Sequence, residues 1–241
     1  MSPEQHAQPP GVDEVLEYLG RSSPRAQPVQ GLLQRTTDLA KTVMPGDCEA
    51  SVTLLLEERP STVVATGPLA VVLDEGQYAR GHGPCLHAAR TREIAEIPDT
   101  RSETRWPDYV RCAAERGNLS SLSVPLDLGD PRASGALNIY ARQPNAFDQV
   151  SRSVATRFAP YAAATAGQLT LHRRAVRRVA DLEAALASRA VIEQAKGILM
   201  ERHDVTAAGA MHILAWASVR THLKVRYLAE HLVDTGELRR R

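Results

Sequence analysis

The spacing of hydrophobic residues divides the chain into a part with mixed α and β patterns and a helical part. Helical spacing, with apolar residues every three or four positions, occurs in residues 29–43, 69–78 and 107–116. Runs with strand character occupy residues 50–56, 62–66 and 93–97. After Phe147 the pattern is helical almost to the end of the chain.

The clearest strand signal is a hairpin between residues 122 and 140. Apolar positions 122, 124 and 126 alternate with two serines and Pro125, and positions 137 and 139 alternate with Asn138 and Tyr140. Gly129-Asp130-Pro131 marks the turn. One apolar and one more polar face predict an antiparallel sheet with helices on one side. Pro125 predicts a bulge or an edge in its strand.

A helical seam precedes the last 55 residues of the chain. It consists of Leu171, Ala175, Val179, Leu182 and Leu186, which are spaced by three or four positions. A stripe this short either packs on its own domain or pairs with a second copy, because coiled coils usually keep the pattern for longer. We expect a homodimer with a coiled-coil-like seam formed by Val179, Leu182 and Leu186.

Three short helices are expected after this seam. The first spans residues 188–202, Thr206 is well placed to N-cap the second, and Gly236 ends the third. The block RAVIEQAKGILM at residues 189–200, followed by Thr206, Ala210, Leu214 and residues 223–229, resembles the ANTAR domain. That family is a three-helix RNA-binding module of bacterial transcription antitermination regulators. The resemblance covers residues 188–238 and implies binding to stem-loops in nascent transcripts.

The upstream region resembles a second family. The segments that carry this resemblance are GHGPCL at residues 81–86, residues 94–99, 106–108 and 145–148, and the hairpin. Together they resemble a GAF domain over residues 29–167. GAF domains are sensor modules with a twisted antiparallel sheet, and many bind a small ligand, so the resemblance implies a small-molecule ligand of unknown identity.

These observations predict an α+β protein with four segments. We expect a mobile N-terminal tail at residues 1–28, with one or two helical turns near its apolar stretch at 12–19, and a GAF-type antiparallel sheet with flanking helices at 29–167. A helical connector at 168–187 then leads to an all-α three-helix bundle at 188–238. The second helix of the bundle opens with Thr206-Ala-Ala-Gly209, where the ANTAR family usually has acidic residues.

The net charge of the whole chain is only +1, but its two parts differ in charge. Residues 1–167 contain 16 Lys and Arg against 20 Asp and Glu, whereas residues 168–241 contain 13 against 8. This asymmetry indicates that the last part meets a polyanion. The alternative is a basic helix face that contacts only solvent.

Five residues of the ANTAR-like region are the expected RNA contacts: Lys196, Arg202, Trp216, Arg220 and Lys224. The four basic side chains fall on or beside the helices of the motif, where they can neutralise phosphates. For any one of them, a solvated surface charge is the alternative. Trp216 either belongs to the core or faces outward, where its ring can stack on an unpaired base.

Catalytic and metal chemistry find little support in the sequence. The chain has no GxSxG, HExxH or phosphate-loop motif, so we expect no enzyme activity. His82, Cys85 and His87 are close in sequence, but zinc needs a third and usually a fourth ligand, and we expect no metal. Cys85 is expected to be a small apolar residue at a helix start rather than a nucleophile. The low aromatic content of 4% disfavours a large planar cofactor, and we expect none.

The sequence shows no sign of a membrane span, a secretory signal or a disulfide framework. No window approaches the ~18 apolar residues of a membrane span, and the N-terminus does not resemble a secretory signal. Three cysteines without a CxxC pair make a poor disulfide framework. We therefore expect a cytoplasmic bacterial regulator that binds RNA and no membrane. The alternatives are a DNA-binding regulator with a helix-turn-helix-like bundle and a protein-interaction module.

Overall fold

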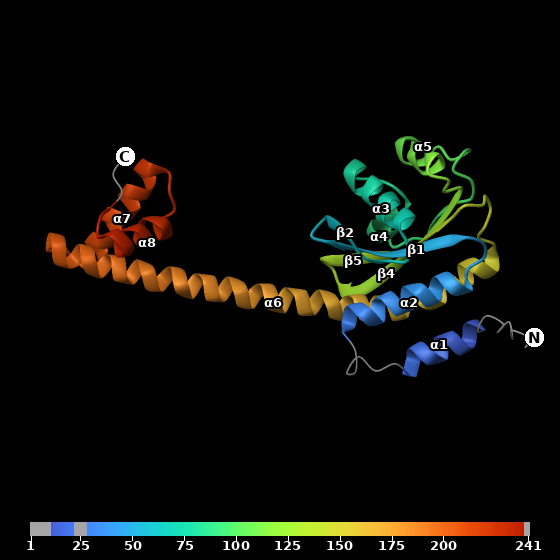
Figure 1. Cartoon of the computed structure of the whole chain (residues 1–241), viewed down its shortest axis with the longest axis horizontal. Coiled ribbons are helices and arrows are strands. Elements are labelled where there is room, and N and C mark those ends of the chain that lie inside the picture. The colour runs from blue at the N-terminus through green and yellow to red at the C-terminus, as the bar shows by residue number, and fades with distance from the viewer. Residues whose placement is uncertain (1–10, 22–27, 239–241) are drawn as a thin grey trace, which may run out of the picture. The chain divides into compact units, whose positions relative to one another are not determined.

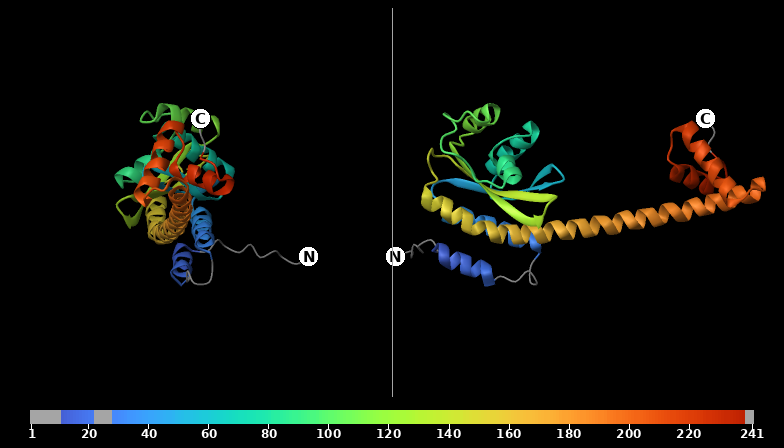
Figure 2. Two further views of the ribbon diagram at one scale, coloured as in Figure 1. Left: turned by 90° about the vertical axis from the view of Figure 1, so that its left-hand side faces the viewer. Right: turned by 180° about the vertical axis from the view of Figure 1, so that it is seen from behind.

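The computed structural model describes residues 11–21 and 28–238 of the chain. The chain forms two compact units, which we call unit 1 (residues 1–171) and unit 2 (residues 172–241). Helix α6 (Gln149–His203) is continuous, with its first part in unit 1 and its last part in unit 2 (Figures 1 and 2). In the described part of the chain, no helix combines the length and the hydropathy needed to cross a membrane.

Unit 1 is built on one antiparallel sheet of five strands in the order β2-β1-β5-β4-β3 (Figure 1). The strands are β1 (Cys48–Leu56), β2 (Arg59–Ala65), β3 (Ala95–Ile97), β4 (Ser120–Asp130) and β5 (Ala133–Ala141). β4 and β5 form the expected hairpin. β3 pairs only with residues 121–123 of β4, so Pro125 lies on an edge segment, as the sequence predicts.

The apolar face of the sheet packs against α2 (Val29–Val43) and the first part of α6, and α1 (Val12–Arg21) packs on the other side of these helices (Figure 1). Alternate residues of the three central strands point to this face, because successive side chains of a strand point to opposite sides. The largest of these buried side chains are Leu54, Leu122, Leu126, Leu137 and Ile139. They form the main hydrophobic core of unit 1.

The more polar face of the sheet is also covered, by α3 (Pro68–Arg80), α4 (Pro84–Thr91) and α5 (Pro107–Glu115). Each of these helices begins with proline, whose missing N–H costs no hydrogen bond in the first turn. The expectation of helices on one side only is therefore wrong. Polar residues alternate along these strands because they bond to one another and to the covering helices, not because they face water.

Residues 12–21 form a longer helix than the one or two turns expected within a mobile tail at residues 1–28, and this helix is docked. They form α1, and Val15, Leu16 and Leu19 are buried in the core on the apolar face. Asp13 forms an ion pair with Arg157 of α6. A helix of this length is marginal on its own, so its stability comes from packing that a local pattern does not reveal. Residues 1–10 and 22–27 of the expected tail lie outside the described residues.

Unit 2 consists of the end of α6, α7 (Ala207–Thr221) and α8 (Val225–Thr235) around a small core of its own. The fully buried core residues are Ala195, Ala210, Leu214, Leu228, Ala229 and Leu232. Small side chains at the contact positions let the helices approach closely. The helix expected at residues 188–202 is the last part of α6, so no break separates it from the expected connector at 168–187.

The expected ends of the last two helices are confirmed. The Oγ1 of Thr206 accepts a hydrogen bond from the backbone N–H of Gly209 at 3.2 Å, which caps α7. Gly236 ends α8 with a φ of 74°, a left-handed conformation that glycine adopts readily. His222 ends α7 with a φ of 55°, an uncommon value for a residue with a side chain.

Removing a buried side chain from α1 tests whether this helix is docked on unit 1. We expect Leu16→Ala to accelerate amide hydrogen exchange in residues 12–21 by about 30-fold. A buried Leu→Ala change costs about 2 kcal/mol or more, and about 1.4 kcal/mol shifts an opening equilibrium tenfold. Glu14→Ala, at an exposed position of the same helix, is the control. If these amides exchange rapidly in the wild type and Leu16→Ala does not change the rate, residues 12–21 are mobile and α1 is not docked.

Candidate functional site

A row of polar side chains crosses the sheet beneath α3, α4 and α5. Ser51, Asn138 and Ser123 are fully buried and lie opposite one another on β1, β5 and β4. The amide of Asn138 donates hydrogen bonds to Ser51 Oγ at 3.2 Å and to Thr53 Oγ1 at 3.0 Å. Asn138 Oδ1 and Ser123 Oγ have no hydrogen-bond partner among the described residues. Since buried polar atoms normally have partners, this face has unused hydrogen-bonding capacity.

Asp74 of α3 adds a carboxylate to this polar face. Its Oδ1 accepts hydrogen bonds from the hydroxyl of Tyr140 at 2.5 Å and the amide of Asn138 at 3.4 Å, and its Oδ2 accepts one from the hydroxyl of Thr62 at 2.8 Å. No described Lys, Arg or His forms an ion pair with it. Burial raises the pKa of Asp74 from 3.8 to about 6, although hydrogen bonds from Tyr140, Ser51 and Thr62 oppose this shift.

Gln77 and Cys85 join α3 and α4 to the same face. Gln77 Nε2 donates to Tyr140 Oη at 3.1 Å, and Gln77 Oε1 accepts from the backbone N–H of Cys85 at 2.8 Å. Burial raises the pKa of the Cys85 thiol, whose Sγ lies 3.4 Å from Thr53 Oγ1. Because the thiolate is the nucleophilic form, this position disfavours nucleophilic chemistry. His82 is exposed, and the described residues contain no group of three His, Cys, Asp or Glu placed to hold a metal ion.

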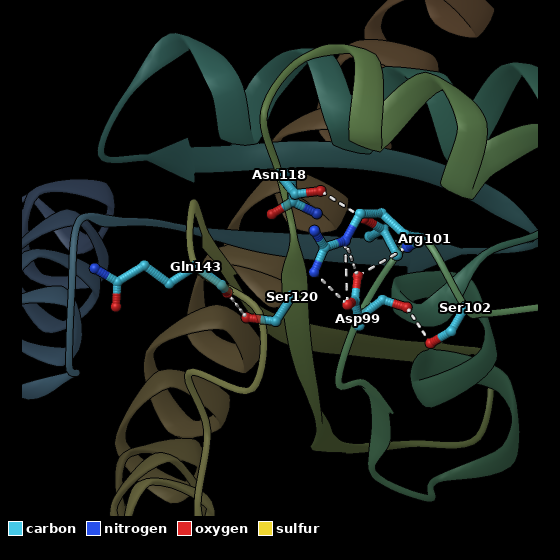
Figure 3. A network of polar contacts seen from close by, with 7 residues as sticks. Asp99, Arg101, Ser102, Asn118, Ser120 and Gln143 are labelled. Carbon is cyan, nitrogen blue, oxygen red and sulfur yellow. Dashed lines mark hydrogen bonds and ion pairs between the residues drawn. The ribbon is translucent and has the colours of Figure 1, made fainter.

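Short-range polar contacts fix the segment between β3 and α5 (Figure 3). Arg101 donates to both carboxylate oxygens of Asp99, and these hydrogen bonds lower the pKa of Asp99 to about 2. The hydroxyl of Thr100 donates to the backbone carbonyl of Asn118 at 3.0 Å. The segment leads directly into Trp106 and α5, which cover part of the polar face. These contacts therefore hold the cover of that face in place.

A cavity of about 370 Å³ lies elsewhere in unit 1, between the β4–β5 turn and α6. Residues 128–133 form one wall, and Gly167, Thr170 and Leu171 form the other. A Cβ at Gly167 would lie 3.4 Å from the carbonyl oxygen of Leu128, an ordinary van der Waals distance, so the turn lies close to the helix here. The walls combine apolar side chains with the turn's own charged residues, a mixture that suits a small amphipathic molecule.

Two of the five expected RNA contacts are bonded within unit 2. Lys196 Nζ donates to both carboxylate oxygens of Glu193, at 3.0 and 2.9 Å, and only 16% of its side chain is exposed. Arg202 donates to the backbone carbonyl of Gly236 at 2.6 Å and so satisfies a carbonyl at the C-terminal end of α8. The bond of Arg202 joins α6 to the end of α8, whereas that of Lys196 stays within α6.

The other three expected contacts, Trp216, Arg220 and Lys224, are exposed. Trp216 is 61% exposed, so its side chain faces outward and is not part of the core. The guanidinium carbon of Arg220 lies over the indole ring, 4.5 Å from its centroid. Neither Arg220 nor Lys224 forms an ion pair with any described residue. Because α7 contains no Asp or Glu, its outer face has no carboxylate to repel a polyanion.

Three further exposed side chains on α7 and α8 were not singled out from the sequence. Val219 is 75% exposed, Tyr227 52% and Met211 38%. Val219 follows Trp216 by three positions, a spacing that places two residues on the same flank of a helix, so the sequence contained a signal for it. Tyr227 lies at the start of α8, and Arg226 lies over its ring, 5.7 Å from the centroid.

The seam residues of α6 are unburied in this structure. Val179, Leu182 and Leu186 are 54%, 59% and 67% exposed, respectively. None of them joins a hydrophobic core formed by the described residues. Of the two alternatives for this stripe, packing on its own domain is therefore not observed.

The buried carboxylate of Asp74 predicts a specific pH dependence. Its pKa is higher in the folded than in the unfolded chain, so its contribution to stability is fully present below pH 4 and is lost as the pH rises to about 6. A shift of this size corresponds to about 3 kcal/mol. We expect Asp74→Asn to remove this loss, as measured by urea unfolding between pH 4 and 7.5. Asp38→Asn, at an exposed position of α2, is the control, and equal pH profiles of all three proteins would contradict the prediction.

Comparison with protein families identifies both parts of the chain. Residues 26–165 match the family model of the GAF domain, and residues 180–233 match that of the ANTAR domain, in the order expected from the sequence. No curated protein matches the chain. At family level, this pair of domains supports a GAF-regulated antitermination regulator, and it suggests a regulatory rather than an enzymatic protein.

Solved structures support the fold of unit 1. The phycocyanobilin-bound GAF domain from a cyanobacterial phytochrome is 10% identical, with 68% of this chain and 97% of that chain covered and a TM-score of 0.52. The phycoerythrobilin-bound GAF domain from a cyanobacterial phytochrome is 11% identical, with the same shares covered and a TM-score of 0.51. At these identities the likeness shows the fold alone. The family model of the GAF domain matches more than half of the chain, and the sheet order and the helices on both faces are consistent with that match. The chain therefore belongs to the GAF domain family, with an ANTAR domain following its GAF domain.

Proposed function

We propose that this protein is a signal-responsive antitermination regulator whose unit 2 binds stem-loop elements in nascent RNA under the control of unit 1. The observation that carries the proposal is the outer face of α7, where exposed Trp216 and Arg220 lie on a helix without a carboxylate. A polyanion is attracted to such a face, and an unpaired base can stack on its aromatic ring. A stem-loop held there would compete with the terminator hairpin of the same transcript.

The five candidate contacts divide into two groups in this proposal. Arg220 and Lys224, which form no ion pair with a described residue, neutralise RNA phosphates, and Trp216 contacts a base. Lys196 and Arg202 are already bonded, Lys196 to Glu193 on the same helix and Arg202 to the C-terminal end of α8. Replacing Arg202 would weaken RNA binding through the shape of the bundle, because its bond joins α6 to α8, rather than through a lost phosphate contact.

The protein acts as a homodimer in this proposal, paired along the seam of α6. Three apolar side chains, Val179, Leu182 and Leu186, recur at helical spacing and are each more than half exposed. Pairing with a second copy would remove this apolar area from water, which stabilises the pair by about 25 cal/mol for each Å² buried. A dimer also presents two RNA-binding faces, which suits an RNA element with two stem-loops.

Unit 1 receives the signal in this proposal, in the form of a small molecule. The unpartnered Asn138 Oδ1 and Ser123 Oγ, together with the buried Asp74 carboxylate, are groups that a polar ligand can engage. α6 begins in the core of unit 1 and ends in the core of unit 2. A change of packing in unit 1 can therefore be transmitted along one helix.

Charges introduced into the seam test the dimer. We expect the double variant Leu182→Glu, Leu186→Glu to sediment as a folded monomer, because carboxylates buried in an apolar seam without partners are costly. Ala184→Glu, on the same helix but outside the seam, is expected to remain dimeric. A double variant that sediments like the wild type would place the contact between copies elsewhere.

A salt series with RNA and DNA probes tests the function itself. We expect the full-length protein to bind a pool of RNA stem-loops with randomised loops more tightly than duplex DNA. Log affinity should fall with log salt by about 0.7 for each phosphate neutralised on single strands, so Arg220→Ala and Lys224→Ala should each flatten the slope by about that amount. Filter binding measures both quantities.

Arg173→Ala and Arg177→Ala are the matched controls for this experiment. They remove the same charge from exposed positions of α6 and should leave the slope nearly unchanged. If they weaken binding as much as Lys224→Ala does, the contact is a diffuse basic surface. Tighter binding to duplex DNA than to the stem-loop pool would favour a DNA-binding regulator instead.

A further inference from the structure

We propose that Trp216 and Arg220 together form a stacking platform for one unpaired nucleobase of the bound RNA. This inference rests on the proposed function, because it assigns the chemistry of one contact within the RNA-binding face. It assigns Arg220 a second role besides neutralising a phosphate: its planar guanidinium lies over the indole of Trp216 and continues the stack on that face. The ligand class at this position is an unpaired base, not a base pair.

The platform is assembled by helical spacing. Trp216 and Arg220 are four positions apart on α7, so their side chains lie on the same flank. The guanidinium carbon lies 4.5 Å from the indole centroid, within the range of a cation–π contact. Both residues are exposed, and Val219 beside them is 75% exposed. A stack of guanidinium on indole is thus exposed next to further apolar area.

Comparison with the other cation–π pairs of the described residues distinguishes this one. Arg105, over Trp106, is also bonded to the carboxylate of Glu103, and Trp106 is only 8% exposed. Arg226, over Tyr227, is bonded to Glu230 Oε1 at 2.8 Å. In both pairs a carboxylate neutralises the guanidinium. Among the described pairs, the one on α7 alone combines an exposed ring with an arginine outside any ion pair.

An unpaired nucleobase is the occupant that fits these properties best. Its planar face can extend a stack of indole and guanidinium, and its own phosphate meets a positive charge without an opposing carboxylate. A base pair inside a duplex exposes only its edges, so it cannot use the platform. Stacking reads no hydrogen-bond pattern, so the platform favours single-stranded loops and tolerates different bases at this position.

Tryptophan fluorescence of the full-length protein tests for the stack directly. The chain contains only two tryptophans, Trp106 and Trp216, so their emission can be separated by substitution. We expect an octamer of adenosine, A8 RNA, to quench the part of the emission that Trp216→Phe removes. An RNA duplex of equal length should leave that part nearly unchanged at equal saturation.

Affinity for A8 RNA in matched variants completes the test. We expect Trp216→Leu to weaken binding about tenfold, in line with the usual effect of removing one stacked base. Trp216→Phe should restore most of the affinity, because it keeps an aromatic face. Arg220→Lys keeps the charge and should weaken binding without flattening the salt slope. Tyr227→Leu, which removes the ring of the neutralised pair on α8, should have little effect.

The outcomes separate this inference from the proposed function. If Trp216→Leu binds A8 RNA like the wild type while stem-loops still bind, the platform is wrong and RNA binding stands. If the wild type binds neither A8 RNA nor the stem-loop pool, both are wrong. If Trp216→Leu weakens the RNA duplex as much as A8 RNA, the residue does not contact an unpaired base, and circular dichroism of the variant shows whether the bundle has lost its fold.

Discussion

Burial of the polar sheet face beneath α3, α4 and α5 is the constraint on which the rest of unit 1 depends. Once water is excluded, the hydroxyls and amides on that face depend on partners in the protein, and Asn138 Oδ1 and Ser123 Oγ have none among the described residues. Asp74 and Gln77 of α3 supply several of these partners. Hydrogen bonds are directional, whereas hydrophobic contacts are not, so α3 has one defined position over the strands. A ligand that entered this face would break several of these hydrogen bonds together, a response that suits a sensor.

Unit 2 uses its basic residues for two separate tasks. Arg202 joins α6 to the end of α8, and Lys196 and Arg226 each bond to a carboxylate one turn away on their own helix. The basic residues on α7 and in the turn after it form no ion pair with the described residues. The net charge of the unit does not reveal this division, because both groups contribute equally to it. The distribution of carboxylates does reveal it: α7 has none, so its surface does not repel a polyanion.

Features with local causes could be predicted from the sequence, and features with tertiary causes could not. The cap at Thr206, the end at Gly236 and the β4–β5 hairpin depend on a few neighbouring residues, and the structure confirms them. α1 depends on packing against distant helices. The alternation of Ser121, Ser123 and Asn138 looks the same whether water or helices cover it. At the candidate site, the sequence pointed to Trp216, Arg220 and Lys224 but not to the exposed Val219 and Tyr227. The bond between Arg202 and Gly236 spans 34 positions and leaves no local signal.

The continuity of α6 constrains how the length of this helix can vary. An α-helix advances about 100° per residue, so inserting one residue into its exposed stretch would rotate every later residue by about 100° around the helix axis. Seven residues complete nearly two turns and bring the apolar stripe back almost into phase. In the proposed dimer, gains or losses of about seven residues would therefore keep the stripe aligned, whereas a single added residue would separate it into two misaligned halves.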